Sequence, residues 1–220
     1  MRSFALFALV ATMTAAVQTP PPQTPPATQP AQPAASQPQP PGRGRGRGGI
    51  QIMTLTSAAW PDGGQIPSKH AQPGGDVSPP LAWSNAPDTA ASFVLIVHDL
   101  DAAIGTGLDD ALHWMVWNIP GSARALAEGV PQGATLPDGS RQISATGPNY
   151  RGPAAPASGP PHHYVFELYA LDTAVDVPAV GASPAQTRAA VLAAMAGHVR
   201  AKGVYTGLFK RTPQANEDPR

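Results

Sequence analysis

Three short stretches of the sequence hold the polar side chains best suited to binding a small anion. They contribute Asp99 and Asp101, then His113, then Gly152, His162 and Tyr164. Proline fixes its own backbone angle and glycine lets the chain pass close to a ligand, so the Gly/Pro-rich segment before His162 predicts a stiff, close-fitting loop. A protonated histidine donates two hydrogen bonds and a tyrosine one. That combination suits a phosphate-like anion better than an apolar ligand.

Each of these residues also has a purely structural explanation. An aspartate in a turn is more often a cap than a ligand. His113 could be a hydrogen-bonded histidine at a strand edge, and Tyr164 could be a core tyrosine with a tethered hydroxyl. By period-two alternation His162 and Tyr164 share one strand face, whereas His163 points to the other face and is expected at the surface. Only the set taken together indicates a site, because the ends of adjacent strands converge in space.

Alternating or continuous apolar runs predict the strands that would bring these stretches together. They cover residues 50–56, 92–97, 112–119, 162–171 and 204–209. The run 92–97 is typical of a central strand covered on both faces. A helix is predicted over 185–202, with Ser183 as N-cap, Pro184 at its first position and Gly203 at its end. The pattern predicts a mainly β fold, an antiparallel β-sandwich with one C-terminal helix.

The segment before this domain has a different composition. Residues 1–17 combine Arg2 with a short apolar run and small residues, as in a secretory signal peptide, with an uncleaved membrane anchor as the alternative. The apolar run is shorter than the roughly 20 residues of a membrane span, which favours cleavage. Residues 18–49 are Pro-rich and then Arg-Gly-rich, which predicts a disordered linker.

The expected organisation is therefore an exported protein, periplasmic or secreted, with its domain over residues 50–211 and a tail over 212–220. The Arg-Gly tract is either a solvated hinge or a peripheral contact with the cell envelope. The sequence also leaves open that two domains pair as a homodimer.

Charge and cysteine content exclude several classes of protein. The chain has 14 Lys and Arg and 14 Asp and Glu. Four of the basic residues and none of the acidic ones precede Ile50, so the domain carries ten against fourteen, a formal net charge of −4. That balance argues against a nucleic-acid surface, which would be strongly basic. Because the chain has no cysteine, disulfides, a lipid anchor on cysteine and a thiol nucleophile are excluded.

Several ordered motifs between Ile50 and Arg211 resemble the phosphatidylethanolamine-binding protein family, which includes the Raf kinase inhibitor protein, and in particular its bacterial branch. The segment from Asp76 to Trp83 is similar to the family's D-x-S-P-P-L-x-W block. The segments 99–103 and 152–164 are similar to its D-P-D-A-P and G-P-x-P-P-x-G-x-x-H-R-Y blocks, and His113-Trp114 to its histidine-bearing strand.

The resemblance implies a β-sandwich with a small anion pocket at one end. Carried over by position, the pocket would be lined by Asp99, Asp101, His113, Gly152, His162 and Tyr164. Leu100 and Ala103 replace both prolines of D-P-D-A-P, which should make that loop less rigid and its mouth wider. His163 replaces the arginine of H-R-Y, which removes a permanent charge.

We therefore expect a non-catalytic protein, without a cofactor, that binds small anions or phosphate and phospholipid head groups, with an inhibitory or regulatory role. Since the predicted set contains no Arg or Lys, affinity should depend on histidine charge. The alternative is a metal-dependent hydrolase, because two His and two Asp could hold Zn²⁺ with an open position. The sequence has neither an H-E-x-x-H motif nor a G-x-S-x-G elbow.

Overall fold

The computed structural model describes residues 49–213. The predicted signal peptide, the predicted linker up to residue 48 and the tail beyond residue 213 lie outside this range. Among the described residues, no helix has the length and apolar character needed to cross a membrane.

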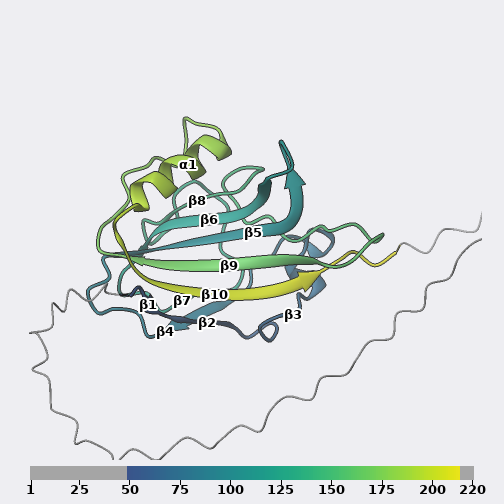
Figure 1. Cartoon of the computed structure of the whole chain (residues 1–220), viewed down its shortest axis with the longest axis horizontal. Helices are drawn as coiled ribbons and strands as arrows, with labels where there is room; N and C mark the ends of the chain where they lie inside the picture. Colours follow the sequence, from purple (N-terminus) through teal and green to yellow (C-terminus); the bar gives the residue numbers. More distant parts are fainter. Residues whose placement is uncertain (1–48, 214–220) are drawn as a thin grey trace, which may run out of the picture. The chain divides into compact units, whose positions relative to one another are not determined.

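A seven-stranded sheet forms the larger layer of the domain (Figure 1). Its strands run in the order β1 (Gln51–Ile52), β10 (Val199–Phe209), β9 (His162–Leu171), β5 (Ser92–Ile104), β6 (Asp109–Pro120) and β8 (Arg141–Ile143), and β3 (Gly64–Gln65) also pairs with β10. The pairs from β10 to β8 are antiparallel, whereas β1 and β3 run parallel to β10. The larger sheet is therefore mixed.

A smaller antiparallel sheet covers one face of the larger one. It consists of β2 (Thr54–Ser57), β4 (Leu81–Ser84) and β7 (Ala125–Leu126). Leu55 and Trp83 from this sheet join one buried cluster with Phe93, Trp114 and Phe166 from the larger sheet. Trp83 and Phe93 meet edge to face, with ring centroids 5.4 Å apart, an arrangement that aromatic pairs favour.

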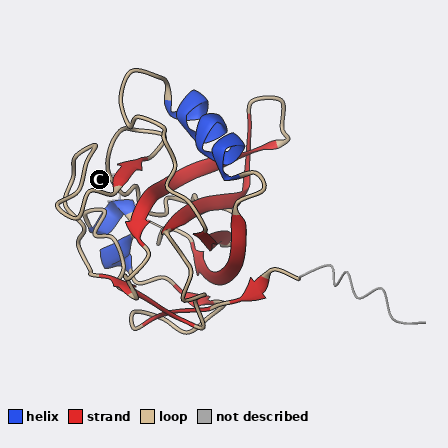
Figure 2. Ribbon diagram, turned by 90° about the vertical axis from the view of Figure 1, so that its left-hand side faces the viewer, coloured by secondary structure: helices blue, strands red, loops and turns tan. Residues whose placement is uncertain are grey.

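Helix α1 (Pro184–Met195) covers the opposite face of the larger sheet, as Figure 2 shows. Val191 and Met195 of the helix pack in a second buried cluster with Val94, Ile96 and Trp117. Strand β5 is thus buried on both faces, which confirms the prediction from its continuous apolar run. Two short 3₁₀ helices, η1 (Ser68–His70) and η2 (Gln72–Gly74), complete the elements. For residues 49–213 the mainly β fold with one α-helix is confirmed, but the label antiparallel β-sandwich fits only loosely.

The predicted helix over 185–202 begins correctly but ends too late. Ser183 caps it in a capping box with Gln186, and Pro184 is its first residue. The α-helix ends at Met195, and Gly197 follows with φ of +83°. Residues 199–203 belong to β10, so Gly203 lies within a strand and is not the end of the helix.

Gly203 has another role, because a Cβ there would lie 3.1 Å from the carbonyl oxygen of Met53. Pairing of β10 with β9 along ten residues outweighs the helical propensity of this segment.

Two further predictions need correction. The single strand expected over 50–56 is divided at Met53, which is buried and donates its N–H to Lys202 O at 2.8 Å. As a result β1 joins the larger sheet and β2 the smaller one. Asp99 and Asp101, expected in a loop, lie within β5, which continues to Ile104.

Candidate functional site

The predicted site residues come from three neighbouring strands and one loop at the same end of the larger sheet. Strand β9 begins at His162 where β5 is ending, and Asp99 pairs with both Tyr164 of β9 and Ala111 of β6. His113 lies two residues further along β6. The antiparallel register therefore brings together residues that are far apart in the sequence.

Asp99 and His162 form the central contact. Oδ2 of Asp99 lies 2.8 Å from Nδ1 of His162. Oδ1 of Asp99 accepts hydrogen bonds from the backbone N–H groups of Asp101, at 3.0 Å, and Ala102, at 3.1 Å. Only 3 % of Asp99 is exposed, so its carboxylate is occupied within the protein. Because Nδ1 of His162 is engaged, Nε2 is the ring nitrogen available to a ligand.

His113 is buried beside this pair. Its Nδ1 lies 2.8 Å from Arg151 O, and its ring stands edge-on to Tyr164, with ring centroids 5.0 Å apart at 88°. Burial lowers the pKa of His113 below its usual value, and the nearby charge of Arg151 acts in the same direction. The charge of Asp99 favours the protonated ring, as expected of a nearby carboxylate, but burial outweighs this effect and the net pKa is lowered.

Tyr164 is fully buried, and its hydroxyl is held by the loop. The oxygen accepts hydrogen bonds from the N–H groups of Ala154 and Ala155, each at 3.2 Å. Burial, with the charge of Asp99, raises the pKa of Tyr164 well above its usual value, so the hydroxyl keeps its proton. These contacts agree with the structural explanation, a core tyrosine with a tethered hydroxyl.

Gly152 fits where a larger residue would not. A Cβ at this position would lie 2.6 Å from His70 O. The N–H of Gly152 donates to Asp76 Oδ1 at 2.8 Å, and its carbonyl accepts from Gln72 Nε2 at 3.1 Å. Residues 70–76 thus hold the loop in place. Sequence reasoning assigned Asp76 no role, although it begins the D-x-S-P-P-L-x-W block.

Asp101 does not join the cluster. Its Oδ2 accepts hydrogen bonds from the backbone N–H of His163, at 2.5 Å, and from His163 Nδ1, at 2.8 Å. The Asp101 side chain is 42 % exposed and that of His163 is 62 % exposed. The expectation that His163 lies at the surface is confirmed. Arg151 was not in the predicted set, but its backbone carbonyl oxygen lies 2.8 Å from Nδ1 of His113.

Within residues 49–213, no group of three or more His, Asp and Glu side chains is arranged to hold a metal ion. A cavity of about 730 Å³ lies away from the predicted residues, between the β5–β6 hairpin and α1. None of the six predicted site residues lines that cavity.

Comparison with known proteins gives consistent matches over most of the described chain. The family model for phosphatidylethanolamine-binding protein matches residues 56–210. A UPF0098 protein of Methanothermobacter thermautotrophicus is 40 % identical over 161 residues, which cover 72 % of this chain and 99 % of that protein. LppC of Mycobacterium tuberculosis, named as a lipoprotein candidate, is 37 % identical over 158 residues, which cover 70 % of this chain and 73 % of that protein.

Two solved structures share the fold over nearly their whole length. A phosphatidylethanolamine-binding protein homolog from Chlamydia trachomatis has a TM-score of 0.59 and 32 % identity, covering 73 % of this chain and 99 % of that chain. YbcL of Escherichia coli, described as a member of the mammalian PEBP family, has a TM-score of 0.61 and 27 % identity with the same coverage.

Proposed function

Because the chain belongs to the phosphatidylethanolamine-binding protein family, we propose that the end of the larger sheet around His113 and His162 binds phosphate or phospholipid head groups. The observation that carries the proposal is the 2.8 Å contact between Asp99 and His162. It fixes the imidazole through Nδ1 and leaves Nε2 as the donor for an anion when the ring is protonated. A charge-assisted hydrogen bond from imidazolium is short and strong.

Proton uptake is part of this proposal. The lowered pKa of His113 keeps its ring neutral in the free protein near pH 7. An anion placed beside it favours the charged ring, so binding takes up a proton and becomes tighter as the pH falls. The buried Tyr164 acts by positioning the loop that contains Gly152, because its hydroxyl accepts from the N–H groups of Ala154 and Ala155.

We propose further that the protein works without catalysis and outside the cytoplasm, as an inhibitory or regulatory binding protein of the cell envelope. The likeness to LppC of Mycobacterium tuberculosis supports an envelope location. Cell fractionation of the full chain, with N-terminal sequencing of the mature protein, tests export and cleavage after residue 17. Recovery of the intact chain from the cytoplasm alone would contradict it.

Calorimetric titration with inorganic phosphate and with phosphoethanolamine, at pH 6 and at pH 8, tests the binding function. We expect tighter binding of both at pH 6. His162→Gln should lose most of the affinity, whereas His163→Gln, at an exposed neighbouring position, should keep it. Equal affinity at both pH values, or equal loss in the two variants, would contradict the proposal.

A further inference from the structure

A second candidate site lies on the helix-covered face of the larger sheet, separate from the proposed anion site. We propose that the cavity between the β5–β6 hairpin and α1 binds an uncharged aliphatic amphiphile, such as a medium-chain alcohol or a monoacylglycerol. Leu112, which lines this cavity, packs in the buried cluster under α1, whereas Tyr164 packs in the cluster between the sheets. The two sites therefore lie on opposite faces of the sheet.

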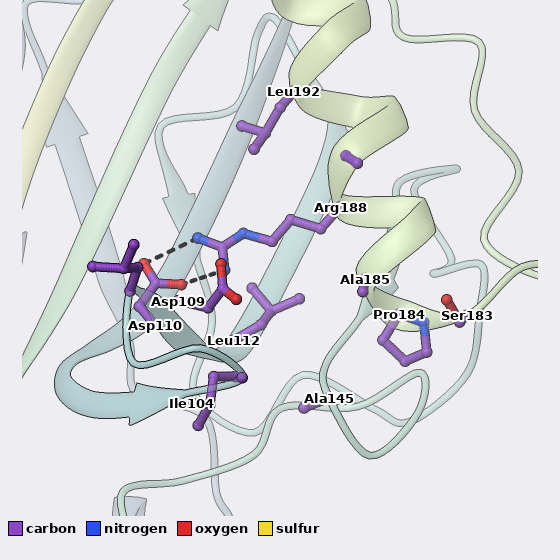
Figure 3. A pocket seen from close by; sticks show the side chains of 13 residues that line it. Ile104, Asp109, Asp110, Leu112, Ala145, Ser183, Pro184, Ala185, Arg188 and Leu192 are labelled. Carbon is purple, nitrogen blue, oxygen red and sulfur yellow. Dashed lines mark hydrogen bonds and ion pairs between the residues drawn. The ribbon is translucent and has the colours of Figure 1, made fainter.

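The size and walls of the cavity suit an alkyl body. Its volume of about 730 Å³ is within the range of small-molecule sites, roughly 300–1,000 Å³. Ile104 comes from the hairpin, Leu112 from β6 and Leu192 from α1 (Figure 3). Leu108 of the hairpin and Ala189 of α1 also line the cavity. No aromatic ring is among the described residues that line it, so the walls offer no stacking surface for a planar base or ring.

Aliphatic side chains around the cavity are left in contact with water. Leu108 is 92 % exposed, Ile104 48 % and Leu192 42 %. Grouped exposed apolar side chains on a soluble domain mark surfaces that bind something. Covering them with an alkyl chain would remove apolar surface from water, which favours binding in proportion to the area covered.

An ion pair forms much of the polar lining, which also includes Asp109 and Ser183. Arg188 reaches from α1 to Asp110 of β6 and donates to both carboxylate oxygens, with Nη2 to Oδ2 at 3.1 Å (Figure 3). Asp110 also binds Nδ1 of His98 behind it. The guanidinium has five N–H donors and uses two of them here, so others remain for a hydroxyl or carbonyl oxygen of a ligand.

The charges at the cavity favour an uncharged ligand. Asp110 neutralises Arg188, and Asp109 adds a second carboxylate to the lining. A phosphate group would meet two carboxylates and an arginine that is already paired, and like-charge contacts are costly. At the proposed anion site, by contrast, the carboxylate of Asp99 is buried and already accepts from His162 and two backbone N–H groups, and that of Asp101 is engaged by His163.

The test is a titration of the ¹⁵N-labelled protein with 1-octanol, followed by amide chemical shifts in NMR spectra. Two variants on the exposed side of α1 are compared: Ala189→Phe, which fills the cavity, and Ala190→Phe, at an exposed position that does not line it. Circular dichroism verifies that both fold. We expect saturable shifts at residues 104–112 and in α1 for the wild type and Ala190→Phe, and about tenfold weaker binding or none for Ala189→Phe.

Absence of saturable shifts in the wild type, their persistence in Ala189→Phe, or equal loss in both variants would overturn the proposal. Octyl phosphate, read at the same cavity amides, should bind about tenfold more weakly than 1-octanol, because of the two carboxylates; equal binding would overturn the assignment of an uncharged ligand. Inorganic phosphate should shift only residues around His162, so failure at one site is distinguishable from failure at the other.

Discussion

The carboxylate of Asp76 accepts a hydrogen bond from the backbone N–H of Gly152 at 2.8 Å, across 76 positions of the sequence. Asp76 has φ of +57°, a left-handed conformation that aspartate adopts more readily than most residues other than glycine and asparagine. Gly152 provides the space for the close approach, because a Cβ there would meet His70 O and the backbone of Ala71. A turn outside the proposed anion site thus fixes the loop within it.

Replacing Asp76 by glycine should destabilise the protein by about 2 kcal/mol, because the buried N–H of Gly152 loses a charged acceptor. Glycine is chosen since it accepts the positive φ without strain. Asp76→Asn keeps an acceptor oxygen and should cost less. Urea denaturation measures both, and phosphate titration should show weaker binding for Asp76→Gly. Wild-type stability in Asp76→Gly would show that the hydrogen bond does not hold the loop.

Gly152→Ala should cost about 1–3 kcal/mol, as expected for overpacking against a backbone that must move. The added Cβ would lie 2.6 Å from His70 O and 2.8 Å from two backbone atoms of Ala71. Thermal unfolding of Gly152→Ala measures the cost, and a matched Ser158→Ala change in the exposed part of the same loop should have little effect. Unchanged stability in Gly152→Ala would mean that the loop relaxes freely.

Tyr164→Phe removes the oxygen that accepts from the amides of Ala154 and Ala155. We expect a loss of about 1–2 kcal/mol, because those N–H groups lose their partner on a buried loop. Phosphate affinity should fall as well, since the loop is no longer anchored. Tyr169→Phe, which removes a hydroxyl bonded to Glu167 instead, should leave phosphate affinity unchanged. A similar fall in both variants would refute a specific role for Tyr164.

His98 should make stability fall as the pH rises above about 6.5. Burial opposes the charge of its ring, but the carboxylate of Glu167, 3.4 Å from Nε2, and the hydrogen-bonded carboxylate of Asp110 prevail and raise the pKa of His98. Both carboxylates also accept from a cationic side chain, Asp110 from Arg188 and Glu167 from Lys202. A histidine whose pKa is raised in the folded state stabilises the protein fully at pH values below its unfolded pKa of about 6.5. This stabilisation is lost as the pH rises through the folded-state pKa.

Urea denaturation at several values from pH 6 upward measures this loss. His98→Gln should remove the alkaline decline, and His163→Gln should retain it. The buried His113, with its lowered pKa, acts in the opposite direction: its stabilisation is present above about pH 6.5 and is lost as the pH falls below that value. An identical pH profile for wild type and His98→Gln would contradict the role of His98.

Local patterns predicted the elements whose signals lie in neighbouring residues. Alternation predicted the strand 162–171 with both of its bounds, and Ser183 followed by Pro184 predicted the start of α1. The continuous apolar run of 92–97 predicted burial on both faces. These features depend on the spacing of side chains along a few turns or strand repeats, which the sequence contains directly.

Pairing and burial could be decided only by the tertiary structure. Residues 199–203 have the composition of a helix but form a strand, because β9 offers them a partner along its whole length. The sequence predicted that Asp101 and His113 lie near one end of the sheet, and they do. However, the Asp101 side chain binds His163, and burial of His113 lowers its pKa and so favours its neutral ring. The types of its residues and their order along the chain determined which chemistry this protein has available. Which side chains meet, and how much water reaches them, depends on contacts between distant segments, and these set the charge of each group.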